Sequence, residues 1–522
     1  MRSVYFYDTT LRDGLQTYGI NMNIENRIQF TKKLISFGID FIEGGFPYSN
    51  KIDEEYFKLI KNELNPTDFN KIVAFGMVCN QYKNIDKDPQ ILSLLNTDCE
   101  KISIVCKSIK NQIAMMNIDV EEYLVCLEEN IKFFHEKNKK IIMGVEHFFD
   151  GFKDDRDYCM KMLNIFDKYN VFNVNLADTR GGILPFEVDS ILKCIKKEYP
   201  TLSLAIHCHN DEEMAVANSI IAVHNGVETI QGTINGIGER VGNANLTSLI
   251  PIIVIKTYYQ NSINKNSLKE LKNISEYLNT ILKVEHNKKL PFVGEDSFAH
   301  KGGLHLSCIV KNSQSYNHID PILVGNKMKV SMSDLSGKAN VQSNLKTFIL
   351  NNKVVLKIED VNINKILEIV KQSQSNGFNL DGTIFIDNIF YKHILKYNYV
   401  ECVFDRFFME DHIVKISLLC KYNQIEKQIC NAYENTISSF QHLFEDIYST
   451  FEINLKYKLN ITSFNIKYSH DEYLFDGQFN LVDDLNQTTF KISKYGKDFL
   501  TDLLNLFSEI FYFIHCYTLI SE

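Results

Sequence analysis

The sequence predicts an α/β fold: a (β/α)8 TIM barrel, then small helical subdomains, then a C-terminal α+β domain of two βββα units. The first ~250 residues alternate short apolar runs with longer amphipathic runs, as repeated βα units do. Eight short apolar runs in that length are typical of a closed barrel. The end of the chain carries a different pattern, alternating strands followed by a helix, and this pattern occurs twice.

Each candidate barrel strand is a short, mostly apolar run between amphipathic stretches. The same alternation also fits a doubly wound parallel sheet, which is the competing arrangement. The candidates are Val4–Tyr7, Phe41–Glu43, Ile72–Phe75, Ile102–Val105, Ile141–Val145, Val174–Leu176, Leu204–His207 and Thr229–Gly232.

The chain, at 522 residues, is too long for one ordinary core, so two to three domains are expected. We predict the barrel over residues 1–262, helical linker subdomains over 263–392 and the α+β domain over 393–522. In the last of these, the first set of strands leads to a helix with Tyr433 on its apolar face. The second set leads to a helix from about Lys497.

Composition narrows the class of protein. With 45% hydrophobic and 23% charged residues the chain is globular in type, and a net charge of −9 gives no electrostatic reason to expect nucleic acid. Twelve cysteines without C-x-x-C pairs fit a reducing compartment. The start has no signal-peptide pattern, and the apolar run Ile510–Ile520 is too short to span a bilayer. We therefore expect a cytoplasmic protein that does not enter a membrane.

Two histidines one residue apart, His207 and His209, end the seventh candidate strand. Residues i and i+2 of a strand point to the same side, so the two imidazoles are expected together. Paired imidazoles suit a divalent metal ion. For an isolated H-x-H pair, a strand with two hydrogen-bonded core histidines is the commoner alternative.

Three further segments carry polar side chains at the carboxyl ends of candidate strands one, two and eight: Asp8–Gln16, Phe41–Gly45 and Asn235–Asn245. Alone, each also fits a capped or ion-paired loop. In a closed barrel strand eight pairs with strand one, so Asp13 and Asn243 would meet the two histidines at the carboxyl ends of the strands. A carboxylate, two imidazoles and an amide oxygen leave two octahedral positions for a chelating substrate.

The motifs in these segments resemble those of the DRE-TIM metallolyase family: Asp-Thr-Thr-Leu-Arg-Asp-Gly-x-Gln, His-x-His-Asn-Asp and Gly-x-Gly-Glu-Arg-x-Gly-Asn. Within that family the chain is most similar to the citramalate synthase branch, beside the isopropylmalate and homocitrate synthases. The resemblance covers about residues 1–345 and is only architectural beyond them. The branch-like stretches are Ile42–Pro47, Glu146–Gly151, Gln231–Gly236, Phe298–His305 and His318–Asn326.

The resemblance implies a metal site and a reaction. Asp13, His207, His209 and Asn243 would bind Mg²⁺, Mn²⁺ or Zn²⁺, which a small 2-keto acid would chelate. The acetyl group of acetyl-CoA would then join the keto carbon, and hydrolysis of the thioester would follow. Pyruvate, which gives citramalate and CoA, is the favoured keto acid.

Other roles follow from the same resemblance. Arg12 would pair with negative charge developing on the keto oxygen, and Glu43 would hold Arg12 or the metal shell in place. Thr179 would donate to the substrate carboxylate, with a strand-end cap as its alternative. Gln16 is a weaker candidate of the same kind.

Removal of a methyl proton beside a thioester needs a positioned base. His305 matches the catalytic histidine of the family, with Glu146 or Asp150 as its carboxylate partner, and both carboxylates stay open. Tyr316 matches a tyrosine near the thioester that comes from a partner subunit, although packing is almost as good an explanation. The linker subdomains would thus contribute to the active site, and the last domain would make a homodimer.

The chain departs from the family at two places. Arg180 stands where the branch usually has a small polar residue, so an added cation beside the carboxylate pocket could alter the choice of keto acid. Gln428–Tyr433 lacks the Gly-rich turn that helps to form a feedback-inhibitor site in relatives. Inhibition by isoleucine or leucine is therefore not implied here.

Three alternative functions stay open: a synthase using another 2-keto acid, a carbon–carbon lyase, and a catalytically silent family member. Lyases of the family carry a cysteine in the Gly-rich loop after strand eight, and Gly238–Asn243 has none. The complete set of four ligands argues against a silent member.

Overall fold

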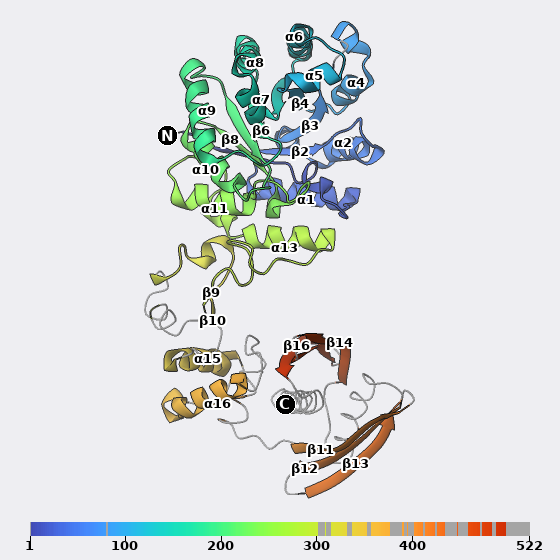
Figure 1. Ribbon diagram of the computed structural model, residues 1–522, viewed down its shortest axis with the longest axis vertical. Coiled ribbons are helices and arrows are strands. Elements are labelled where there is room, and N and C mark those ends of the chain that lie inside the picture. The colour runs from blue at the N-terminus through green and yellow to red at the C-terminus, as the bar shows by residue number, and fades with distance from the viewer. Residues whose placement is uncertain are drawn as a thin grey trace. The chain divides into compact units, whose positions relative to one another are not determined.

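The computed structural model describes two compact units, and each is considered by itself (Figure 1). The first unit is Met1–Phe298 with Ile319–Lys327, and the second is Ala299–His318 with Met328–Glu522. The described residues are 2–79, 82–300, 308, 315–330, 337–351, 357–375, 389–390, 394, 401–410, 413–422, 425–433, 446, 458–469, 472–482 and 487–496.

The first unit is a closed barrel of eight parallel strands in sequence order. The ring closes because β1 pairs with β8, with Tyr5 opposite Thr229 and Asp8 opposite Gly232. This closure confirms the barrel and shows that the doubly wound alternative is wrong. The strands are β1 (Tyr5–Asp8), β2 (Phe41–Gly45), β3 (Ile72–Met77), β4 (Lys101–Lys107), β5 (Lys140–Glu146), β6 (Asn173–Asp178), β7 (Leu204–Cys208) and β8 (Thr229–Gly232).

Helices surround this ring (Figure 1). Short polar side chains begin many of them: those of Asn23, Asn50 and Asp155 each accept a hydrogen bond from a backbone N–H of the first turn. The helices of the first unit are α1 (Ile24–Phe37), α2 (Lys51–Glu63), α3 (Pro66–Phe69), α4 (Pro89–Leu95), α5 (Lys110–Met115), α6 (Val120–Glu136), α7 (Phe148–Asp154), α8 (Arg156–Lys168), α9 (Pro185–Glu198), α10 (Ala215–His224), α11 (Leu246–Lys256), α12 (Lys265–Leu268) and α13 (Leu271–Leu282).

The interior of the barrel holds a small apolar cluster below the polar cavity. Tyr7, Val73 and Ile142 form a buried cluster inside the ring, separate from the large core between strands and helices. Along β5, Gly144 and Glu146 follow Ile142 at intervals of two and share its side of the strand. The polar site therefore lies on the carboxyl-end side of this cluster.

The barrel unit continues through α12 and α13, past the predicted boundary at residue 262. The second unit holds β9 (Ala299–His300) paired in parallel with β10 (Lys329–Val330), and the helices α15 (Lys338–Asn351) and α16 (Ile363–Ser375). The three-domain division stays a prediction.

Two antiparallel three-stranded sheets follow in the second unit. They are β11 (Glu401–Glu410), β12 (Ile413–Tyr422) and β13 (Ile425–Tyr433), then β14 (Lys458–Ser469), β15 (Glu472–Val482) and β16 (Gln487–Gly496). The prediction that Tyr433 lies on a helix is wrong, because it is the last residue of β13 and pairs with Val414. β12 and β13 form a hairpin of nearly equal strands, so their pairing continues to Tyr433. Of the other residues in the helices predicted after each sheet, only Asp446 lies among the described residues, and it is helical.

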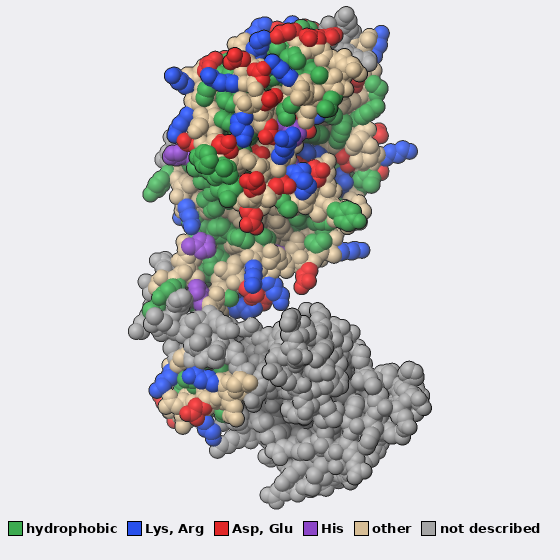
Figure 2. Space-filling view, in the orientation of Figure 1, with side chains coloured by type: hydrophobic (Ala, Val, Ile, Leu, Met, Phe, Trp, Pro, Cys, Tyr) green, Lys and Arg blue, Asp and Glu red, His purple; other side chains and the backbone are tan. Residues whose placement is uncertain are grey.

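Among the described residues, no helix is both long and apolar enough to cross a bilayer. On the visible face of the first unit, acidic and basic side chains are interspersed (Figure 2).

Candidate metal centre and active site

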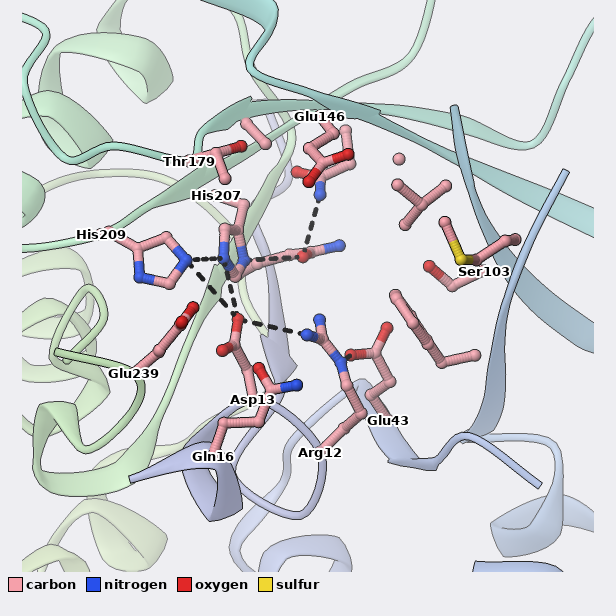
Figure 3. Close-up of a pocket in the computed structure, with 17 residues that line it drawn as sticks. Arg12, Asp13, Gln16, Glu43, Ser103, Glu146, Thr179, His207, His209 and Glu239 are labelled. Carbon is pink, nitrogen blue, oxygen red and sulfur yellow. Dashed lines mark hydrogen bonds and ion pairs between the residues drawn. The ribbon is translucent and has the colours of Figure 1, made fainter. Parts of the chain in front are cut away.

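A cavity of about 280 Å³ opens at the carboxyl ends of the barrel strands. Its lining comes from seven of the eight strands and from the loops that follow β1, β6, β7 and β8, so residues far apart in the chain meet there (Figure 3). Eight residues predicted from the sequence line it: Arg12, Asp13, Gln16, Glu43, Glu146, Thr179, His207 and His209.

Three of these side chains converge on one point. Asp13 Oδ2 lies 3.1 Å from His207 Nε2 and 3.9 Å from His209 Nε2, and the two Nε2 atoms are 3.5 Å apart. All three residues are buried. Together they offer one oxygen and two nitrogens within 4.8 Å of one another, the spacing of a set of metal ligands.

Asn243 completes the predicted set from the loop after β8, although it is not among the residues that line the cavity. It forms an isolated bridge with His209, and its Nδ2 donates to the backbone oxygen of Ile237 over 3.3 Å. Its Oδ1 is buried without a partner among the described residues. A buried amide oxygen without a partner, on a residue bridged to His209, is a donor that a divalent cation could use.

The loop that carries Asn243 depends on Gly238, whose φ is +156°. A Cβ at this glycine would overlap Asn243 Nδ2. The absence of a side chain at Gly238 therefore leaves the space in which the amide of Asn243 lies.

Electrostatics gives Asp13 and His209 the charge states that a metal ion needs in its ligands. Burial by itself would raise the pKa of Asp13, but the Arg12 guanidinium and then His207 outweigh it and hold that pKa well below its usual range. Burial, helped by neighbouring His207, lowers the pKa of His209 to about 4. At neutral pH, Asp13 is therefore an anion and His209 is neutral.

Arg12 is fixed beside this cluster. Its Nε donates to Glu43 Oε2 over 2.6 Å, and its Nη1 lies 3.3 Å from Asp13 Oδ2. The Tyr7 hydroxyl donates to the other Glu43 oxygen over 2.8 Å, and the guanidinium lies over the Phe75 ring at 4.2 Å. The guanidinium is held on two sides by anions and on one face by a ring, so its orientation in the cavity is set.

Thr179 lies in the loop directly after β6. Its Oγ1 accepts a 2.8 Å hydrogen bond from the backbone N–H of His147, which adopts a left-handed conformation with φ of 56°. Its backbone oxygen accepts from Arg240, which also forms a two-pronged pair with Asp211. These contacts join the loops after β5, β6, β7 and β8 around one threonine.

The two candidate carboxylates are placed differently. Glu146, at the end of β5, lines the cavity and pairs with Lys107. Asp150, in α7, does not line it and lies 3.5 Å from His147 Nδ1 and 3.7 Å from Arg180 Nε. The Arg180 side chain is 66% exposed and is likewise absent from the lining.

The cavity gives no evidence on the predicted roles of two residues, His305 and Tyr316. His305 lies outside the described residues. Tyr316 is 42% exposed and belongs to the second unit. Their catalytic roles stay predictions.

The cavity is also lined by polar residues for which no role was predicted from the sequence. The sequence could have indicated them, because each lies on the inward side of a strand or in a motif already noted. They are Ser103, Asn175, Gln231 and Glu239.

Comparison with known proteins identifies two family models and several relatives that match this chain. The model of the HMGL-like family matches residues 3–275, and that of the homocitrate synthase post-HMGL domain-like family matches 292–377. The (R)-citramalate synthase of Aquifex aeolicus is 38% identical over 380 residues, which cover 73% of this chain and 71% of that protein. The (R)-citramalate synthases of Geobacter sulfurreducens and Sulfolobus acidocaldarius are 37% and 34% identical, each over 73% of this chain and over 71% and 72% of their own.

The match to the HMGL-like model spans the barrel and its cavity, and the relatives extend it into the following region. The chain therefore belongs to the HMGL-like family, in the branch that contains the (R)-citramalate synthases.

Proposed function

We propose that this protein is an acyltransferase that condenses acetyl-CoA with pyruvate and, after hydrolysis of the thioester by water, releases citramalate and CoA. The observation that carries the proposal is the buried cluster of Asp13, His207 and His209 beside Arg12, in a chain whose relatives are named (R)-citramalate synthases.

The four proposed ligands are Asp13, His207, His209 and Asn243. The convergence of the first three and the unpaired amide oxygen of the fourth support this set. A bound divalent cation would polarise the keto carbonyl as a Lewis acid. Two nitrogen and two oxygen donors suit Zn²⁺, Mn²⁺ and Mg²⁺, and which of these is used is left to the metal titration below.

Arg12 is proposed to stabilise the negative charge that develops on the keto oxygen. The Glu43 carboxylate and the Phe75 ring hold its guanidinium before substrate arrives, so no reorganisation is needed during the reaction. Glu43 acts through Arg12 and is thus a positioning residue.

Thr179 is proposed to bind the carboxylate of the keto acid. Its Oγ1 already accepts from the backbone N–H of His147, so its hydroxyl proton is free to be donated. Gln16 lines the same cavity and is proposed as a second donor.

The proposed base for the methyl proton of acetyl-CoA is His305. Of the two candidate partners, the geometry favours Glu146, because it lines the cavity and Asp150 does not. Tyr316 is proposed to lie near the thioester, supplied by the other subunit of a homodimer. We propose that the enzyme works in the cytoplasm, because its twelve cysteines form no C-x-x-C pairs, as is usual in a reducing compartment.

The test uses the purified full chain, stripped with a chelator and resupplied with Mg²⁺, Mn²⁺ or Zn²⁺. Free CoA is followed with a thiol reagent, and the product is identified by mass. Pyruvate is compared with 2-oxobutyrate, 2-oxoisovalerate and 2-oxoglutarate. The expected result is metal-dependent CoA release that is fastest with pyruvate.

One variant within the proposed site and one outside it test whether the site binds the metal and supports CoA release. Asp13→Ala should lose both bound metal and CoA release, whereas Asp189→Ala, which removes a surface carboxylate of α9, should keep both. Failure to release CoA with every keto acid, together with unchanged metal content in Asp13→Ala, would overturn the proposal. A faster rate with another keto acid would keep the condensation and reject pyruvate.

A further inference from the structure

Gln231 and Asn175 form a hydrogen-bonded pair that reaches one proposed metal ligand. We propose that this amide pair is a positioning relay, which holds His207 as the tautomer protonated on Nδ1 and keeps its Nε2 available to a metal ion. The inference rests on the metal site of the proposed function, and it concerns how that site is kept ready.

The relay crosses three neighbouring strands. Gln231 Oε1 lies 3.0 Å from Asn175 Nδ2 and 3.2 Å from His207 Nδ1. Gln231 is also the direct partner of His207 in the ladder between β7 and β8. Asn175 comes from β6, the strand on the other side of β7. All three residues are buried and line the cavity.

The orientation of the two amides sets the tautomer of the imidazole. In the structure Asn175 Nδ2 donates to Gln231 Oε1, so the oxygen of Gln231 is the atom turned toward its neighbours. That same oxygen faces His207 Nδ1, which must therefore carry the proton. A neutral imidazole has one such proton, so Nε2 is left with a lone pair.

His207 Nε2 faces the other two converging side chains, the position from which its lone pair would reach a bound cation. Its neighbours are Asp13 Oδ2 at 3.1 Å and His209 Nε2 at 3.5 Å. If the Gln231 amide were turned by 180° while Asn175 kept its orientation, the NH₂ group of Gln231 would face both Asn175 Nδ2 and His207 Nδ1. The imidazole proton would then move to Nε2, where it would bond Asp13 and block a metal ion.

The pair keeps two unsatisfied buried atoms. Asn175 Oδ1 and Gln231 Nε2 have no partner among the described residues, and such an atom costs roughly 1–3 kcal/mol. Two apolar side chains of similar volume would avoid this cost. The amides are therefore explained better by the oxygen they present to His207 than by packing.

Two charge-adding variants separate the relay from simple electrostatics. Gln231→Glu keeps an oxygen that can accept from both neighbours, whereas Asn175→Asp replaces the donor that orients the Gln231 amide. Each adds one negative charge near the site, so a purely electrostatic effect would strengthen cation binding in both. The relay instead predicts opposite results.

The probe is Mn²⁺, titrated calorimetrically into the chelator-stripped full chain. We expect Gln231→Glu to bind Mn²⁺ at least as tightly as the unmodified protein. Asn175→Asp and Gln231→Met should bind it about 10–100-fold more weakly. Thr229→Val is the matched control: it removes a buried hydroxyl from the same face of β8, two residues earlier, and should leave binding unchanged.

A second measurement reads the tautomer without metal. In protein labelled with ¹⁵N-histidine, the His207 signals, assigned through His207→Gln, should indicate a proton on Nδ1. They should indicate one on Nε2 in Asn175→Asp. Thermal unfolding shows whether each variant is folded, and the spectrum of Asn175→Asp keeps the test decisive if Gln231→Met does not fold.

Several outcomes would overturn the relay: tight Mn²⁺ binding by Asn175→Asp, equal losses in Gln231→Glu and Gln231→Met, or a proton on Nε2 in the unmodified protein. The failure of the metal site itself is distinguishable. If Asp13→Ala binds Mn²⁺ normally, the site is wrong; if it loses Mn²⁺ while Asn175→Asp does not, only the relay is wrong.

Discussion

Replacement of Gly238 by alanine should damage the metal site while the barrel stays folded. Gly238 has φ of +156°, and a Cβ there would overlap Asn243 Nδ2, the amide group next to the proposed ligand oxygen. The overlapping group is the end of a side chain, so the clash is relieved by moving that side chain rather than the strands.

The expected loss of stability and the expected loss of metal binding differ in size. A residue forced into this backbone region costs about 1–3 kcal/mol, which a chain with this large core should tolerate. The Asn243 amide must shift by roughly 1 Å, and a displacement of that order in a site can cost about 10²-fold. We therefore expect Gly238→Ala to weaken Mn²⁺ binding by about 100-fold and to lower Tm by only a few degrees.

The assay is calorimetric titration of Mn²⁺ into the chelator-stripped chain, with thermal unfolding followed in parallel. Gly182→Ala is the matched control from the loop after β6, because a Cβ there would meet only Glu212 Oε1, at 3.7 Å. It should bind Mn²⁺ normally. Normal binding by Gly238→Ala would refute the reasoning, and equal losses of binding in both glycine variants would do so too.

Four other changes test the remaining residues. Glu146→Gln should lower kcat by about 10²-fold or more, and Asp150→Asn by less than about threefold, in the CoA-release assay; equal losses would contradict the choice of Glu146. Thr179→Val should lower kcat/KM for pyruvate by about 10–100-fold at saturating acetyl-CoA, and an unchanged KM would exclude a bond to the keto acid. Arg12→Lys should lower kcat by about 10²–10³-fold, because a lysine cannot reproduce the planar fork, and a near-normal rate would remove Arg12 from the reaction. Burial raises the pKa of Asp8 to about 7. The stability it contributes is therefore present below about pH 4 and lost as pH rises through 7, so Asp8→Asn should stabilise the protein more at pH 8 than at pH 5 in urea unfolding, and equal effects would contradict this.

The order of the barrel strands could be predicted because each strand is a local pattern. Short apolar runs bounded by amphipathic stretches gave all eight strands to within a few residues. The alternation of side chains along a strand also predicts that His207 and His209 share one side, and their Nε2 atoms indeed lie 3.5 Å apart. Tyr433 was misplaced because the extent of β13 depends on its partner, Val414, which its own sequence does not contain.

The sequence by itself determined the barrel, the end of it at which the polar cavity opens and the residue types of the proposed metal site, since these follow from local periodicity and motifs. Only the tertiary structure decided which polar groups meet. It placed Glu146 in the cavity, because β5 ends at that residue, and Asp150 outside the cavity, because α7 carries it. It joined Asn175 and Gln231 to His207, because hydrogen bonds between strands depend on register. Such contacts link residues far apart in the chain, and no local pattern records them.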